Sequence, residues 1–383
     1  MAKRPRIYVS LSSSDFDRYT YEGISQYVEE NALEIDLEIR LDHANLLPDG
    51  KGLITRLLNK KDVQIVRAYN FPIVNISSRL EATEVPSVIL DIELAGRLAA
   101  EHLLARRFHH FAFYGEHMGR HSLSQSHGFE QVVKEAEFPC ELHLHHWKAT
   151  TFDLTSTENQ KIRKWLKSLP RPVGIFCGSD RAAWEISKAA EALGFAVGRD
   201  VGIVGFGNND FLCNISHPKL TSVGIQPIQH AYEAMALLMR LIRGEPAPSA
   251  PILIPPSIFS RGSSDFFITS DSYVTNAIQF IQAHITEVPP IQAVFDHIPL
   301  SRDALERRFR KHLGYTVMET IHFLKIDRIK HLLVSTSKTM EEIALATGLS
   351  GGTYMGVMFR GKMGMTPSQY RHRFQRHSPS LSS

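Results

Sequence analysis

Residues 300–314 have the sequence LSRDALERRFRKHLG, and residues 349–364 have the sequence LSGGTYMGVMFRGKMG. Both stretches place an apolar residue, and four positions later a phenylalanine, at the spacing of one helix face. Both then continue through basic residues to a glycine, which often ends a helix. The two stretches therefore predict two helices of the same design, about 50 residues apart in the chain.

The second stretch is rich in glycine. Glycine destabilises a helix interior by up to about 1 kcal/mol relative to alanine, so a phosphate-binding loop is the alternative interpretation. The spacing of apolar residues, phenylalanine and glycine that this stretch shares with residues 300–314 favours a helix. Ser350 is then expected to cap the N-terminus of this helix, as Ser301 does in the first stretch. Gly348 and Gly364 then fall in the turns that flank this helix.

A short amphipathic segment precedes each helix, IQAVFDHI before the first and MEEIALATG before the second. Two helices joined by a short turn, the second with an exposed polar face, form the helix-turn-helix arrangement that places one helix in the DNA major groove. From residue 301 onward the chain has 14 Lys and Arg against 6 Asp and Glu, whereas the first 300 residues have 29 against 34. This basic excess indicates a polyanion as partner, and double-stranded DNA fits both observations.

The last 100 or so residues resemble the AraC/XylS family of transcription regulators. The resemblance rests on EEIALATG, Ser350, Phe359, GMTP and the pair Tyr370–Arg371, with LKIDRIKHLL as the helix that connects the two units. It implies a DNA-binding homodimer with RNA polymerase as a further partner, and no cofactor, metal or enzymatic activity. Pro299 stands where the family has glycine, and since proline cannot take a positive φ, this turn must differ from the family's.

The resemblance also implies which residues contact DNA. Base contacts are expected from Arg302, Asp303, Glu306, Arg307, Gly352, Thr353, Gly356 and Val357. Arginine can donate two hydrogen bonds to guanine and glutamate can accept one from cytosine, whereas glycine offers no side chain. Phosphate contacts, which position the protein without specifying sequence, are expected from Arg310, Lys311, Arg360, Lys362, Arg371 and Arg373. We therefore expect the first unit to provide most base recognition and the second mainly to position the protein, with its glycines on the side that faces the groove.

Residues 6–262 alternate short apolar runs with amphipathic segments. RIYVSL, VPSVIL, HHFAFYG, PVGIFCG and VGIVGFG are typical of buried strands, and the segments between them are typical of helices. This alternation predicts parallel sheets covered on both faces, in two lobes. The class is therefore a two-lobed α/β region followed by an all-α domain with two helix-turn-helix units. We expect the α/β region at residues 1–265, the DNA-binding domain at 266–376 and a disordered tail at 377–383.

The N-terminal region resembles the LacI/type I periplasmic-binding-protein sensor fold through HSLSQSHGFEQVV, GIFCGSDRAAWEISKAAEALG and VGIVGFGNNDF. The resemblance and the strand-end positions imply the ligand residues Ser14, Asp15, Arg18, Asp91, Gln125, Asp180 and Asn208. Sugar hydroxyls need donors and acceptors held rigidly, and strand ends can supply them. The alternative for Asp180, which is compatible with ligand binding, is to cap the helix that follows it. Gly207 and Gln125 depart from the family pattern, which has Asp and Arg at these positions.

Together the two regions resemble the xylose-responsive regulators. We expect a sugar-controlled transcription activator whose effector is xylose or another pentose. The alternatives are a DNA-binding regulator with a degenerate sensor, a sugar-binding protein outside transcription, and an enzyme with an appended DNA-binding domain. Three scattered cysteines, an N-terminus without a signal-peptide pattern and no 18-residue apolar run favour a cytoplasmic protein without a membrane partner.

Overall fold

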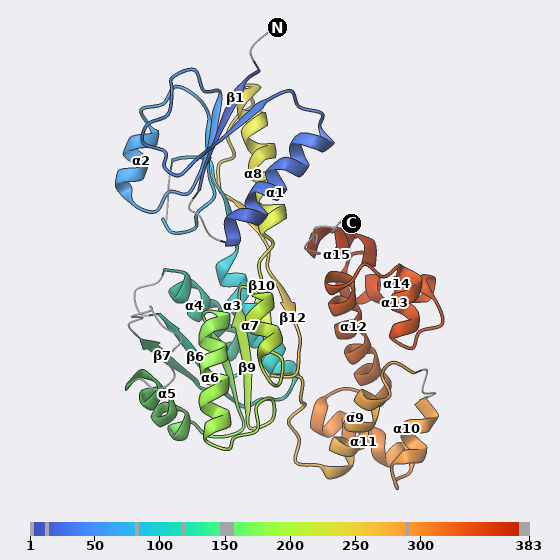
Figure 1. Ribbon diagram of the computed structural model, residues 1–383. Coiled ribbons are helices and arrows are strands. Elements are labelled where there is room, and N and C mark those ends of the chain that lie inside the picture. The colour runs from blue at the N-terminus through green and yellow to red at the C-terminus, as the bar shows by residue number, and fades with distance from the viewer. Residues whose placement is uncertain are drawn as a thin grey trace. The chain divides into compact units, whose positions relative to one another are not determined.

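The structure is a computed structural model of residues 1–383, and it describes residues 4–11, 15–80, 84–116, 120–145, 157–287 and 291–374. The chain forms two compact units, Met1–Leu94 with Ile225–Pro256, and Ala95–Gly224 with Ser257–Ser383. Figure 1 shows the helices and strands of both. None of the described helices combines the length and the apolar character that a bilayer-spanning segment needs.

Unit 1 contains a parallel sheet with strand order β2-β1-β3-β4, and a parallel pair of β5 and β11. Its helices α1 and α8 approach so closely that a Cβ at Gly23 would lie 2.2 Å from the carbonyl oxygen of Ile228. The elements are β1 (Arg6–Ser10), α1 (Asp15–Glu30), β2 (Asp36–Arg40), β3 (Gly52–Thr55), α2 (Lys60–Val66), β4 (Ile73–Asn75), β5 (Val88–Leu90), α8 (Pro227–Ile242) and β11 (Ile252–Ile254).

Unit 2 begins with a sheet of order β12-β10-β9-β8-β6-β7, parallel except for β12, which is antiparallel to β10. Alternate residues of β6 enter different cores, Ala112 and Tyr114 with Trp165 and Ile186, and Phe113 with Phe129. The elements are α3 (Ile92–Ala105), which starts in unit 1, β6 (His110–Glu116), α4 (Arg120–Glu135), β7 (Cys140–His145), α5 (Thr157–Ser168), β8 (Val173–Cys177), α6 (Asp180–Ala192), β9 (Val201–Phe206), α7 (Asp210–Ile215), β10 (Thr221–Gly224) and β12 (Ser257–Phe259).

The predicted parallel sheets with helices on both faces are therefore confirmed. Strands β11 and β12, which lie in a stretch rich in Pro and Ser, were not among the predicted strands. Both are three-residue strands at sheet edges, and such short segments show too little alternation to be recognised.

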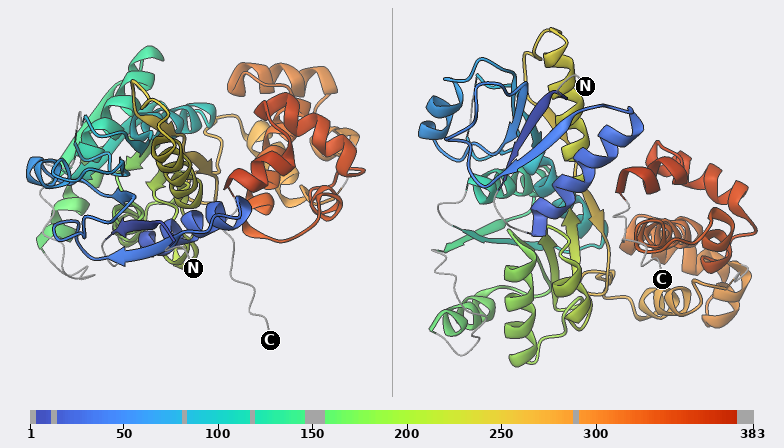
Figure 2. Two further views of the ribbon diagram at one scale, coloured as in Figure 1. Left: turned by 90° about the horizontal axis from the view of Figure 1, so that it is seen from above. Right: turned by 45° about the horizontal axis from the view of Figure 1, so that its top comes forward.

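The rest of unit 2 is helical, as predicted. Figures 1 and 2 show two groups of helices, α9 to α11 in orange and α13 to α15 in red, joined by the long helix α12. One end of α12 adds Val317 and Ile321 to the core of the first group, and its other end adds Ile329 and Leu333 to the core of the second. The helices are α9 (Ser272–Ala283), α10 (Ile291–His297), α11 (Arg302–Leu313), α12 (Val317–Ser335), α13 (Met340–Ala346), α14 (Gly352–Met363) and α15 (Pro367–Phe374).

Candidate functional site

The first helix-turn-helix consists of α10 and α11. Ser301 caps α11 by accepting a hydrogen bond from the Ala304 N–H at 3.3 Å, and Gly314 ends the helix with a left-handed φ of 76°. Leu305 and Phe309 are fully buried, as predicted, in the core that α9 and α12 share. The polar face of α11 is thereby fixed toward solvent.

That face presents most of the expected contact residues. Arg302, Asp303, Arg307, Arg310 and Lys311 are all exposed. Glu306 is half-buried, and its carboxylate accepts a hydrogen bond from the Val317 N–H at the start of α12, at 3.3 Å. The exposed face of α11 is therefore basic, and the two longest exposed side chains in its first two turns are Arg302 and Arg307.

The turn that precedes α11 differs from that of the second unit, as Pro299 predicted. In the second unit Gly348 has a left-handed φ of 62°, and the Leu349 N–H bonds back to the Ala344 carbonyl oxygen at 2.9 Å. In the first unit the Leu300 N–H instead reaches the Ile298 carbonyl oxygen at 2.7 Å. Proline cannot adopt the positive φ of Gly348, and it lacks the N–H that Gly348 donates to the Leu345 carbonyl oxygen.

The second recognition helix, α14, begins in an unexpected way. Ser350 was expected to cap it, and this is wrong: Gly351 is the N-cap residue and offers no side chain. The Glu341 carboxylate of α13 accepts the hydrogen bond from the Gly352 N–H instead, at 2.7 Å. A Cβ on Gly352 would lie 2.9 Å from that carboxylate oxygen, so the glycine leaves room for Glu341.

The glycines of α14 therefore have separate explanations. We expected Gly351 and Gly352 to leave the groove-facing side of the helix without side chains. This expectation is corrected, because both glycines lie beside the Glu341 carboxylate and leave room for it. Gly356 does have open space beside its Cα, and Thr353 is exposed. Val357, the counterpart of Arg307, is 71% exposed, so this helix shows an apolar side chain where the first shows a cation.

The expected phosphate contacts of the second unit fall into two groups. Arg360 and Lys362 are exposed at the end of α14. Arg371, on α15, is half-buried and donates hydrogen bonds to the carbonyl oxygens of Leu333 and Lys338, so it already holds the end of α12. The side chain of Arg373 lies outside the described residues.

In the sensor part of unit 2, Asp180 is held in a polar network at the carboxyl ends of the strands. It is only 2% exposed, and its two carboxylate oxygens accept hydrogen bonds from the Ser222 hydroxyl at 2.5 Å and the Asn209 N–H at 2.6 Å. Asp180 is not the helix cap, because Ser179 caps α6 by accepting from the Ala182 N–H. Its carboxylate instead fixes the turn after β9.

Asn208 and Gln125 lie near the same strand ends. Asn208 has a positive φ of 53°, donates its N–H to the Ser222 hydroxyl and accepts a hydrogen bond from Arg261 Nη2 at 2.7 Å. Gln125 is fully buried and donates weakly to the Gly178 carbonyl oxygen, 3.4 Å away. Among the described groups its Oε1 accepts no hydrogen bond, so it can still accept one from a ligand.

The remaining expected ligand residues belong to unit 1. Arg18 is exposed on α1. Asp91 caps α3, because its Oδ1 accepts a hydrogen bond from the Leu94 N–H at 3.0 Å. Ser14 and the side chain of Asp15 lie outside the described residues. Within the described ranges, no His, Cys, Asp and Glu side chains are grouped so as to hold a metal ion.

Comparisons with known proteins match both halves of the chain. Residues 100–264 match a periplasmic binding protein-like domain, and residues 296–373 match a helix-turn-helix domain. The xylose operon regulatory protein of Haemophilus influenzae is 28% identical over 93% of this chain and 95% of its own length. A solved structure of the xylose-binding transcription activator XylR is 26% identical, covers 98% of this chain and 100% of that chain, and has a TM-score of 0.63.

The chain is an AraC-type transcription regulator with a periplasmic-binding-protein-like domain. A ribose-bound LacI-family regulator from Enterococcus faecium is also similar, at 18% identity, with 69% of this chain and 100% of that chain covered and a TM-score of 0.54, which shows the fold of the sensor. The regulator binds DNA and is not an enzyme. The predicted family and fold class are thus confirmed.

Four residues that organise the regulator were not recognised from its sequence. Ser222 and Arg261 hold Asp180 and Asn208, and Glu341 caps α14. Arg106, 1% exposed, joins the sensor to α12. The strand signal of LTSVGI could have located Ser222, since β10 adjoins β9, but nothing local to the other three indicates their partners.

Proposed function

We propose that the regulator is an activator that binds DNA as a homodimer in the cytoplasm, that a pentose such as xylose is its effector, and that it contacts RNA polymerase. We also propose the functional division that the sequence predicts, with a sensor at residues 1–265 and a DNA-binding domain at 266–376. The proposed pentose rests on the match to the xylose operon regulatory protein, which extends through both domains in the same order.

The geometry that supports a sugar effector is the buried polar set at the ends of β8, β9 and β10. Asp180 and Asn208 are held rigidly by Ser222 and Arg261, and Gln125 retains a free acceptor beside them. A rigid set of donors and acceptors discriminates between sugars, because a ligand that lacks a hydroxyl leaves one of these groups unpaired.

A second candidate is a DNA-binding regulator whose sensor no longer binds sugar. It is favoured by Asp180, whose two carboxylate oxygens both accept hydrogen bonds inside the protein. A sugar would then have to bind through other groups at these strand ends. If no other groups bind it, the sensor has no sugar effector.

The test is thermal unfolding of the full chain with D-xylose, L-arabinose, D-ribose and D-glucose. A ligand at 100 times its Kd stabilises the folded state by about 2.7 kcal/mol, so a pentose effector should raise Tm and D-glucose should not. Asp180→Asn should remove the rise while binding of the unliganded protein to DNA persists. Intact DNA binding with no shift from any sugar would support the degenerate sensor.

A further inference from the structure

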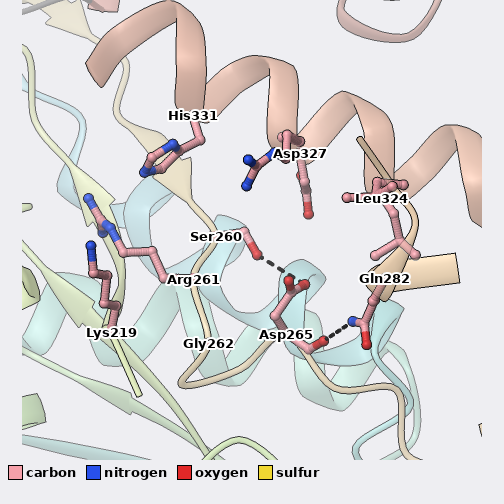
Figure 3. Close-up of a pocket in the computed structure, with 11 residues that line it drawn as sticks. Lys219, Ser260, Arg261, Gly262, Asp265, Gln282, Leu324, Asp327 and His331 are labelled. Carbon is pink, nitrogen blue, oxygen red and sulfur yellow. Dashed lines mark hydrogen bonds between the residues drawn. The ribbon is translucent and has the colours of Figure 1, made fainter. Parts of the chain in front are cut away.

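A cavity of about 480 Å³ lies within unit 2, between the sensor lobe and the helical domain (Figure 3). Lys219 and residues 260–262 line it from the sensor side, and Asp327 and His331 of α12 line it from the helical side. Its volume is in the range of small-molecule sites. It lies apart from Asp180, which is not among its lining residues.

One end of the cavity is acidic but already neutralised. Asp265 and Asp327 both pair with the buried Arg106, at 3.1 and 2.7 Å, and Lys330 lies 3.4 Å from Asp327. Gln282, beside them, donates to the Asp265 carbonyl oxygen. This end therefore offers carboxylate, amide and hydroxyl groups without a net charge to attract an ion.

The other end is cationic. Lys219, Arg261 and Arg328 line it, and none of them forms an ion pair with any carboxylate in the part of the chain that the structure describes. In the described part of the chain, the Arg261 guanidinium donates to two neutral acceptors, the Leu220 carbonyl oxygen and Asn208 Oδ1. Figure 3 shows Lys219 and Arg261 grouped near the His331 ring, with Asp265 and Gln282 at the opposite end.

The titration of His331 reflects this unbalanced charge. Burial lowers its pKa, and the charges of Arg261, Arg328 and Lys219 lower it further, to about 4. The imidazole is therefore neutral at physiological pH, and three cations surround it. Cations that line one end of a cavity without a counter-ion repel one another, and an anion among them would relieve that repulsion.

We propose that this cavity is a second effector site, distinct from the sugar site, that binds the phosphate monoester of a small polyhydroxy compound. Lys219, Arg261 and Arg328 would hold the phosphate by charge-assisted hydrogen bonds. Ser260, Gln282 and the Asp265 carboxylate are placed to bond the hydroxyls at the opposite end. Because Arg261 also holds Asn208 and His331 belongs to α12, an anion here contacts both the sensor and the DNA-binding domain.

The test is calorimetric titration of the full chain with glycerol 3-phosphate, with glycerol as the uncharged comparison. Lys219 and Arg328 are exposed, and their side chains make no hydrogen bond to the described residues, so the double variant Lys219→Gln, Arg328→Gln should fold. Each lost cation removes charge-assisted hydrogen bonds, so we expect at least tenfold weaker binding. The charge-matched control is Arg163→Gln, Lys164→Gln on the exposed face of α5, which should leave the affinity unchanged within about twofold.

Saturable binding of glycerol 3-phosphate but not glycerol, lost in the cavity variant alone, is the expected result. Absence of saturable binding, or equal affinity in the cavity variant, would overturn the proposal; equal affinity would place the ligand elsewhere in the protein. A cavity variant that instead weakens DNA binding and lowers its salt dependence, while no phosphate ester binds, would also overturn it, because the cations would then contact DNA phosphates.

Discussion

Arg106 Nη2 lies 2.7 Å from Asp327 Oδ2, and this ion pair joins the end of α3 in the sensor lobe to the middle of α12. The same nitrogen donates to Ser260 and Asp265, and the Arg106 side chain is 1% exposed. Burial alone would raise the pKa of Asp327, but the charges of Lys330 and Arg106 outweigh it and hold that pKa below its ordinary value. A buried ion pair therefore forms part of the contact between the sensor and the DNA-binding domain.

Replacing Arg106 should destabilise unit 2 strongly. Arg106→Met leaves Asp265 and Asp327 without their shared cation in a buried setting, and breaking such a pair costs about 3–5 kcal/mol of the free energy of unfolding. Urea denaturation measures it. The control is Arg199→Met, which removes an ion pair with Asp200 in which the arginine is 70% exposed and should change stability by less than about 1 kcal/mol. An equal loss of stability in the two variants would mean that the buried ion pair contributes no more to the free energy of unfolding than the exposed one.

Acid should destabilise unit 1 through His230. Burial lowers its pKa to about 4, although its Nε2–H bonds to the Val88 carbonyl oxygen at 2.7 Å. Because the folded pKa lies below the unfolded value of about 6.5, the unfolded chain binds the proton first. The stabilisation is full above pH 6.5 and is lost as the pH falls toward 4, at up to about 1.4 kcal/mol per pH unit.

Denaturation at several pH values would measure that slope. His230→Gln should reduce it between pH 6.5 and 4, whereas His109→Gln, at an exposed position, should leave it unchanged. An identical slope in the wild type and the His230 variant would show that other groups determine the acid sensitivity.

The start of α14 should depend on Glu341 and not on Ser350. Glu341→Ala removes the acceptor for the Gly352 N–H and should lower stability by about 1 kcal/mol, the usual effect of losing a helix cap. Ser350→Ala should change little, and Ser301→Ala, which removes the cap of α11, should resemble Glu341→Ala. Thermal unfolding of the three variants compares them directly, and a large effect of Ser350→Ala would contradict the observed cap.

The two recognition helices should differ in base specificity. Arg307→Ala should weaken binding by about 1–3 kcal/mol and relax the preference at one base pair, whereas Arg310→Ala should weaken binding to all sequences and lower the salt slope by about 1. Val357→Ala in the second unit should leave base preference almost unchanged. Binding to a randomised operator library at two salt concentrations separates these outcomes, and strong base preference lost with Val357 would assign recognition to α14.

Much of the architecture could be predicted from the sequence. The repeated frame of Leu305–Phe309 and Met355–Phe359, the apolar strands and the charge difference between the two regions are properties of short stretches. Periodicity and composition are local, so they indicate helices, strands and the helix-turn-helix units without any knowledge of partners.

The partners of individual side chains were decided only by the tertiary structure. Glu341 and Gly352 are 11 residues apart, Asp180 and Ser222 are 42 apart, and Arg106 and Asp327 are 221 apart. The second stretch has one more residue between its serine and Met355 than the first has before Leu305, so Gly351 takes the cap position and Glu341 accepts the bond from the Gly352 N–H. A local pattern specifies which face of an element is buried, whereas a hydrogen bond depends on the positions of two backbones to within a fraction of an ångström, and only the packed fold fixes those.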